Sequence, residues 1–262
     1  MSDLGLICFV ALDDWQPVEA PALRQALSYS APNSSITLTP RDSEDAILVS
    51  IDRQEFLVAS MQGQIPEPEY SQAMRNSLFW PDAGAEMAQH TAFVAIAAVA
   101  PEDAHGLVRA QAVALTRLAA AVAEAAPSLG VYWRGAEGAV PPGRLLSAPS
   151  EIAAGKWPVD IWIGYVFYGQ DTGQHPMIGV QTRGAEAYLG FEIEVPPITV
   201  ASGDRKEPLR ILFGAVGYLM AQGAQIRNGQ QVQVAGERRT TWQLHTATGG
   251  GPGLAQLTAV EG

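Results

Sequence analysis

Unbroken apolar segments of strand length are the clearest pattern in the first half of the chain. Residues 4–12 form one such segment, which ends at two aspartates, and residues 91–100 form another without a charge. Segments of this kind are typical of strands that are covered on both faces. Between them the pattern predicts a helix over residues 18–28 and three short strands over residues 35–39, 46–51 and 55–61.

Apolar residues at helical spacing predict the remaining helices. The clearest is an alanine-rich helix over residues 102–126, which Pro127 ends. The same spacing predicts a helix after Pro66 and further helices over residues 82–89, 141–154 and 206–224. The second half also holds predicted strands over residues 130–133, 159–168, 177–182, 188–195, 230–235 and 241–246.

Strands that occur both in series and between helices predict an α+β fold with mostly antiparallel or mixed sheets packed by helices. The first half reads as strand, helix, strands, helix and strand, which resembles a ferredoxin-like arrangement with an extra strand. We place a boundary near Pro127. It separates an N-terminal half, residues 1–126, from an aromatic-rich C-terminal half, residues 127–262, and the two halves can also form one compact domain.

The charge balance narrows the classes of partner. The 262 residues include 27 acidic and 16 basic ones, for a net charge of −11. Nucleic-acid binding requires a basic face, so we expect no nucleic-acid partner. No apolar segment reaches the roughly 20 residues of a membrane span, and the first residues lack the basic region of a secretory signal, so we expect a cytoplasmic protein without membrane contact. Cys8 stands alone and is expected to be a packed apolar side chain.

Four motifs follow one another along most of the chain: Trp80-Pro81 with Ala83, His90 with Ala92, Gly130-Val131-Tyr132-Trp133, and Thr182-Arg183-Gly184 with Gly190-Phe191-Glu192-Ile193-Glu194. In this order they resemble an uncharacterised bacterial family, the domain of unknown function 4261. The resemblance implies an intracellular bacterial α+β protein and no established reaction, substrate or cofactor. The chain departs from the family pattern at residues 61–66, where members show Met-Pro-x-Pro-Ile-Pro, and at Phe93, where members often have a second histidine.

Glu192 and Glu194 are the acids with the best case for chemistry. Residues two apart on a strand share a face, so both carboxylates should point the same way. Such a pair can divide acid and base roles or hold a divalent cation. A solvated strand face produces the same alternation, and the pattern alone favours that interpretation. His90 closes a predicted helix, where an imidazole suits the carboxyl end, and we favour this role over catalysis.

The remaining candidates predict no cofactor or metal site. The other histidines, His105, His175 and His245, lack helical metal-pair spacing, and we expect His175 in an exposed hairpin loop and His245 on a solvated strand face. The sequence contains no phosphate-binding loop. Aromatic residues around Trp162, Tyr165 and Tyr168 could bind a partner, although core packing is the commoner role of such residues in a sheet.

The absence of a recognisable catalytic constellation leads to a binding hypothesis. We expect a non-enzymatic accessory protein that acts by protein–protein contact, with an acidic surface suited to a basic partner such as a toxin. The alternative is a small-molecule or metal-dependent enzyme that uses Glu192 and Glu194. A third hypothesis is a homo-oligomeric subunit that associates through an edge strand or an aromatic patch.

Overall fold

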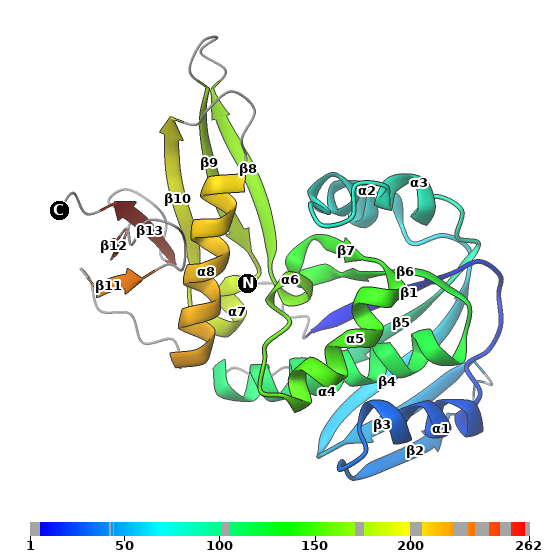
Figure 1. Ribbon diagram of the computed structural model, residues 1–262. Coiled ribbons are helices and arrows are strands. Elements are labelled where there is room, and N and C mark those ends of the chain that lie inside the picture. The colour runs from blue at the N-terminus through cyan, green and yellow to red at the C-terminus, as the bar shows by residue number, and fades with distance from the viewer. Residues whose placement is uncertain are drawn as a thin grey trace. The chain divides into compact units, whose positions relative to one another are not determined.

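The computed structural model describes residues 6–41, 43, 45–100, 105–170, 176–199, 206–222, 230–233, 241–246 and 253–259 (Figure 1). Over these ranges the chain consists of helices and of antiparallel or mixed sheets, which confirms the predicted α+β fold class. The chain forms two compact units, Met1–Trp162 (unit 1) and Ile163–Gly262 (unit 2).

Unit 1 contains, over its described residues, a seven-stranded sheet with the order β2-β3-β4-β5-β1-β6-β7, in which all neighbouring strands are antiparallel. The strands are β1 (Ile7–Leu12), β2 (Ile36–Pro40), β3 (Ala46–Ile51), β4 (Gln54–Gln62), β5 (Ala92–Ala98), β6 (Ser128–Trp133) and β7 (Gly138–Val140). Strands β4-β5-β1-β6, with α1 (Ala20–Ser30) and α4 (His105–Ala125), have the β-α-β-β-α-β arrangement of ferredoxin-like folds. The hairpin β2–β3, inserted between α1 and β4, extends one edge.

Helices cover both faces of this sheet (Figure 1). Helices α1, α4 and α5 (Pro142–Ala153) lie on one face, and α2 (Glu67–Asn76) and α3 (Ala83–Met87) lie on the other. Successive side chains of β1, from Val10 to Leu12, are all buried although they point to alternate faces. The same holds for Ala92 to Val94 of β5, so β1 and β5 are strands covered on both faces, as the sequence predicts.

The segment after Pro127 is part of unit 1. Strand β6 pairs with β1, with Val131 opposite Val10 and Trp133 opposite Cys8. A short 3₁₀ helix (Arg134–Ala136) then leads into β7, which pairs with β6. Because β6 and β7 complete the sheet, the predicted boundary near Pro127 lies inside unit 1, and the division falls after Trp162.

Unit 2 contains, over its described residues, a mixed six-stranded sheet with the order β11-β12-β13-β10-β9-β8. Its strands are β8 (Gly164–Gln170), β9 (Met177–Arg183), β10 (Glu192–Thr199), β11 (Gln230–Gln233), β12 (Thr241–Thr246) and β13 (Leu254–Ala259). Strands β10 and β13 are parallel, and the other neighbours are antiparallel. Helix α8 (Lys206–Gln222) packs against β9 and β10. Its bounds are close to those of the helix predicted over residues 206–224.

Two predicted strands begin too early. The segment 159–168 starts with one helical turn, α6 (Val159–Trp162), because the carbonyl of Pro158 accepts the N–H groups of Ile161 and Trp162. The segment 188–195 starts inside α7 (Ala185–Leu189). Glycines with φ of 82° and 85°, Gly184 and Gly190, delimit α7, and this left-handed conformation is one that glycine adopts without strain.

Gly130 of β6 lies in close contact with Trp80 and with Met87 of α3. A Cβ atom added to Gly130 would lie 2.5 Å from the Trp80 ring and 2.6 Å from the Met87 sulfur. Both neighbours belong to the buried cluster on the α2/α3 face of the sheet, which also contains Phe93 and Tyr132. Only a residue without a side chain fits here.

We expect Gly130→Ala to lower the free energy of unfolding of unit 1 by about 1–3 kcal/mol, because the methyl group overpacks a filled core. Urea unfolding followed by tryptophan fluorescence measures this, since Trp80 is part of the contact. Gly143→Ala is the matched control. Gly143 lies exposed in the first turn of α5 with no atom within 4 Å of an added Cβ, so this substitution should raise stability by up to about 1 kcal/mol. Equal stability of Gly130→Ala and the unmodified chain would contradict the packing argument.

Candidate functional site

Glu192 closes the turn between β9 and β10. Its carboxylate accepts the backbone N–H groups of Gly184 (2.7 Å) and Ala185 (3.2 Å) at the start of α7, and the hydroxyl of Thr182. The Thr182 oxygen in turn accepts the N–H of Ile193 (2.8 Å). The first N–H groups of a helix have no partner within it, and a carboxylate there is favoured by the helix dipole. Glu192 therefore serves as the cap of α7.

Glu194 lies two residues along β10, on the same face as Glu192, as predicted. Its carboxylate accepts the Tyr168 hydroxyl of β8 and the side-chain amide of Gln256 on β13 (2.8 Å). The two glutamates thus bind different partners: Glu192 a helix terminus, and Glu194 side chains from two other strands. These internal hydrogen bonds give each of the two carboxylates a structural role.

His90 is buried in unit 1, where its imidazole contacts backbone groups of both Ile65 and Met87. Its Nε2 accepts the N–H of Ile65 (2.8 Å), and its Nδ1 contacts the carbonyl of Met87 at the end of α3. These roles assign a neutral ring with the proton on Nδ1. The Tyr70 ring lies beside the imidazole with a centroid separation of 5.5 Å. This position at the carboxyl end of a helix is the one that the sequence predicts.

Two of the three predicted partner-binding aromatics are buried within their own units. Trp162 is buried in unit 1, where its indole N–H donates to the Thr116 hydroxyl (2.8 Å). Tyr165 is buried in unit 2 with its ring 5.8 Å from that of Phe213. Tyr168 is half-buried and bonded to Glu194. Trp162 and Tyr165 therefore contribute to packing.

The other chemical candidates add no site among the residues that the structure describes. Cys8 is buried, and burial raises the pKa of its thiol far above the usual range, so it is an unreactive packed side chain. His175 lies outside the described residues, whereas His105 lies in α4 and His245 in β12. The described residues contain no group of three or more His, Cys, Asp or Glu side chains placed to hold a metal ion.

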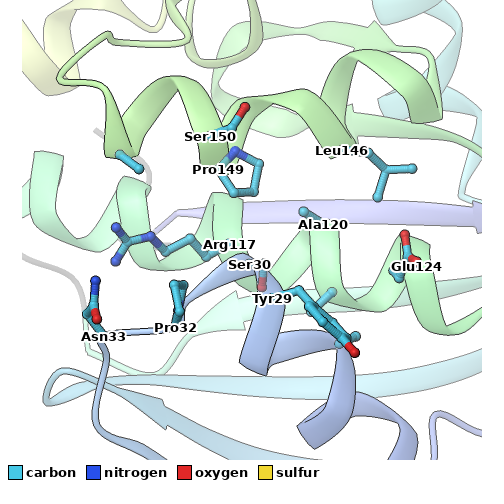
Figure 2. Close-up of a pocket in the computed structure, with 13 residues that line it drawn as sticks. Tyr29, Ser30, Pro32, Asn33, Arg117, Ala120, Glu124, Leu146, Pro149 and Ser150 are labelled. Atoms are coloured by element: carbon cyan, nitrogen blue, oxygen red, sulfur yellow. The ribbon is translucent and has the colours of Figure 1, made fainter.

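A groove of about 310 Å³ on unit 1 has no counterpart among the sequence predictions (Figure 2). It runs between α1 and α5, with α4 beneath it. Arg117 and Glu124 come from α4, and the apolar lining between α1 and α5 includes Tyr29, Leu146 and Pro149. The alanines of α4 that line the groove, Ala120 and Ala121, favour a helix wherever they stand, so the sequence alone does not reveal the groove. The seven-residue spacing of Arg117 and Glu124, two helical turns, is the signal that could have indicated a polar strip.

The motifs quoted for the family resemblance meet at two structural points. Trp80, His90 and Gly130 come together around α3, and the Thr182 and Glu192 motifs form the β9–α7–β10 turn. Comparison of the chain with models of protein families, with curated proteins and with solved structures finds no match. The family resemblance therefore stays a prediction. Among the helices described, none combines the length and apolar character that crossing a bilayer requires.

We expect Glu192→Gln to destabilise the β9–α7–β10 turn by about 1–3 kcal/mol, because an amide nitrogen would face backbone N–H groups that cannot become acceptors. Hydrogen exchange of the Gly184 and Ala185 amides should accelerate correspondingly. Glu194→Gln is the control in the same unit. Its partners, a tyrosine hydroxyl and a glutamine amide, can reverse donor and acceptor, so its cost should be smaller. A larger effect of Glu194→Gln would contradict the capping role of Glu192.

Proposed function

We propose that the protein is a non-enzymatic accessory protein of the bacterial cytoplasm that acts by contact with a basic protein partner such as a toxin. The observation that carries this proposal is the use of Glu192, Glu194 and His90 in internal hydrogen bonds. A general acid or base has to reach a substrate proton, and these groups are directed at the chain itself. The residues with the best case for chemistry are thus accounted for by structure.

The charge of the chain supports a basic partner. A net charge of −11 attracts an oppositely charged protein and accelerates its encounter. The turn after β1 presents two exposed aspartates, Asp13 and Asp14, and then Trp15, which is 41% exposed. Tryptophan is enriched among residues that dominate interface energetics. This turn combines a site for a cationic residue with an apolar anchor.

We expect the tagged chain to recover one stoichiometric basic protein from a lysate of its native cells, and the purified pair to re-form a complex. The association rate, measured by stopped-flow fluorescence, should fall about tenfold between low and high salt, because salt screens the attraction. The double substitution Asp13→Asn and Asp14→Asn should lower the same rate. Trp15→Ala should mainly raise the dissociation rate.

Leu107→Ala is the control for Trp15→Ala, since Leu107 is 50% exposed on α4 and remote in sequence from the acidic turn. Failure to recover a stoichiometric partner would overturn the proposed function. An association rate insensitive to both salt and the aspartate substitutions would overturn the electrostatic part of it.

A further inference from the structure

Two arginines of unit 1 differ in how many of their N–H donors form hydrogen bonds within the described chain. Arg144 of α5 forms paired hydrogen bonds with Asp160 (2.5 and 2.7 Å) and with Glu151 (both 3.0 Å), and a further one with Ser147 (3.0 Å). These contacts raise the pKa of Arg144, chiefly through the hydrogen bond that its guanidinium donates to Asp160. All the nitrogens of this guanidinium are engaged.

Arg117 of α4 has one hydrogen bond, from Nη1 to the Ser34 hydroxyl (3.2 Å), among the residues that the structure describes. Its Nε is buried and has no partner there. The hydroxyl of Ser30, which lines the same groove, is likewise buried without a described partner. An arginine presents five donors, and buried polar groups are rarely left unpaired. At this end of the groove two buried polar groups, the Arg117 Nε and the Ser30 hydroxyl, are therefore left without a hydrogen-bond partner among the described residues.

The groove has charges of opposite sign at its two ends (Figure 2). Arg117 and Glu124 lie seven residues apart on α4, which corresponds to about 10.5 Å along the helix axis. The lining between them is apolar and includes Ala120, Leu146 and the exposed ring of Tyr29. A ligand that fits this arrangement carries an anionic group, an apolar middle and a cationic group.

We propose that this groove binds the extended C-terminal tail of a basic protein partner, with the terminal carboxylate on Arg117 and a lysine or arginine of the tail near Glu124. Three extended residues span about 10 Å, which matches the axial separation of the two charged residues. A guanidinium binds a carboxylate through two parallel hydrogen bonds, and the chain end supplies a carboxylate even where a basic protein has few acidic side chains. The inference rests on the proposed function, because it specifies the part of the partner that is bound.

Synthetic peptides test this directly. The probe is a pool of hexapeptides, Gly-Ser-Lys followed by three positions randomised among Ala, Val, Leu, Phe and Tyr, prepared with a free or an amidated C-terminus. Capture on the full immobilised chain, followed by mass spectrometry, should enrich free-acid peptides about tenfold over their amidated counterparts. Replacement of the probe lysine by glutamine should reduce capture.

Variants locate the binding. Arg117→Gln should abolish the preference for the free acid, and Arg117→Lys, which retains charge without the paired geometry, should restore part of it. Glu124→Gln should remove the preference for lysine. Ala153→Trp fills the groove from an exposed position of α5 and leaves Arg117 in place, so it tests the site even where an Arg117 variant folds poorly. Arg24→Gln, an exposed arginine of α1 outside the groove lining, should behave as the unmodified chain.

Equal capture of free and amidated peptides, or capture unchanged by both Arg117→Gln and Ala153→Trp, would overturn the inference. A purified partner that binds the Arg117→Gln variant with unchanged affinity would also overturn it while leaving the proposed function intact. Conversely, groove-dependent peptide capture without a stoichiometric partner in the lysate would support the inference and count against the proposed function.

Discussion

The need to cover both faces of the β1–β5 strand pair determines the architecture of unit 1. These two central strands are apolar at successive positions, so neither face of the sheet can remain in water without a large free-energy cost. Helices α2 and α3 cover one face, and α1, α4 and α5 cover the other. Because α4 contacts both α1 and α5, only a strip of its surface remains between them, and that strip forms the groove.

The close approach of the Trp80 ring to β6 follows from the same need to cover both faces of the sheet. Gly130 lets the Trp80 ring reach the strand, and α3 then places the Met87 carbonyl where the His90 imidazole contacts it. In unit 2, hydrogen bonds connect a short helix to its neighbouring strands. Glu192 supplies acceptors for the start of α7, so that β9 and β10 can be joined by a helix of five residues. His90 and Glu192, which look reactive in the sequence, thus satisfy backbone groups that the fold would otherwise leave unpaired.

Local patterns predicted the fold class, most of the elements and the position of His90, because burial and capping act over a few residues. The same patterns misplaced the starts of β8 and β10. At β8 the carbonyl of Pro158 stabilises a helical turn in a segment rich in β-forming residues, and at β10 two left-handed glycines enclose α7. Membership of β6 in unit 1 depends on its pairing with β1, more than a hundred residues earlier, and such pairing has no local signature. The role of Glu192 depends equally on groups that only the folded turn brings together.

Arg144 and Arg117 illustrate why a side chain with unused hydrogen-bond donors is more informative about binding than one that looks reactive. Both arginines lie on helices of unit 1, and the chain surrounds Arg144 with two carboxylates and a hydroxyl. Near Arg117 the described chain provides the Ser34 hydroxyl as an acceptor. The acidic residue on the same helix, Glu124, lies two turns away from Arg117 and not one. At a one-turn spacing the two charges would neutralise each other. At two turns the charges stay apart, so in the proposed complex each would pair with a group of the ligand, and the apolar strip between them would supply burial that an isolated ion pair at the surface lacks.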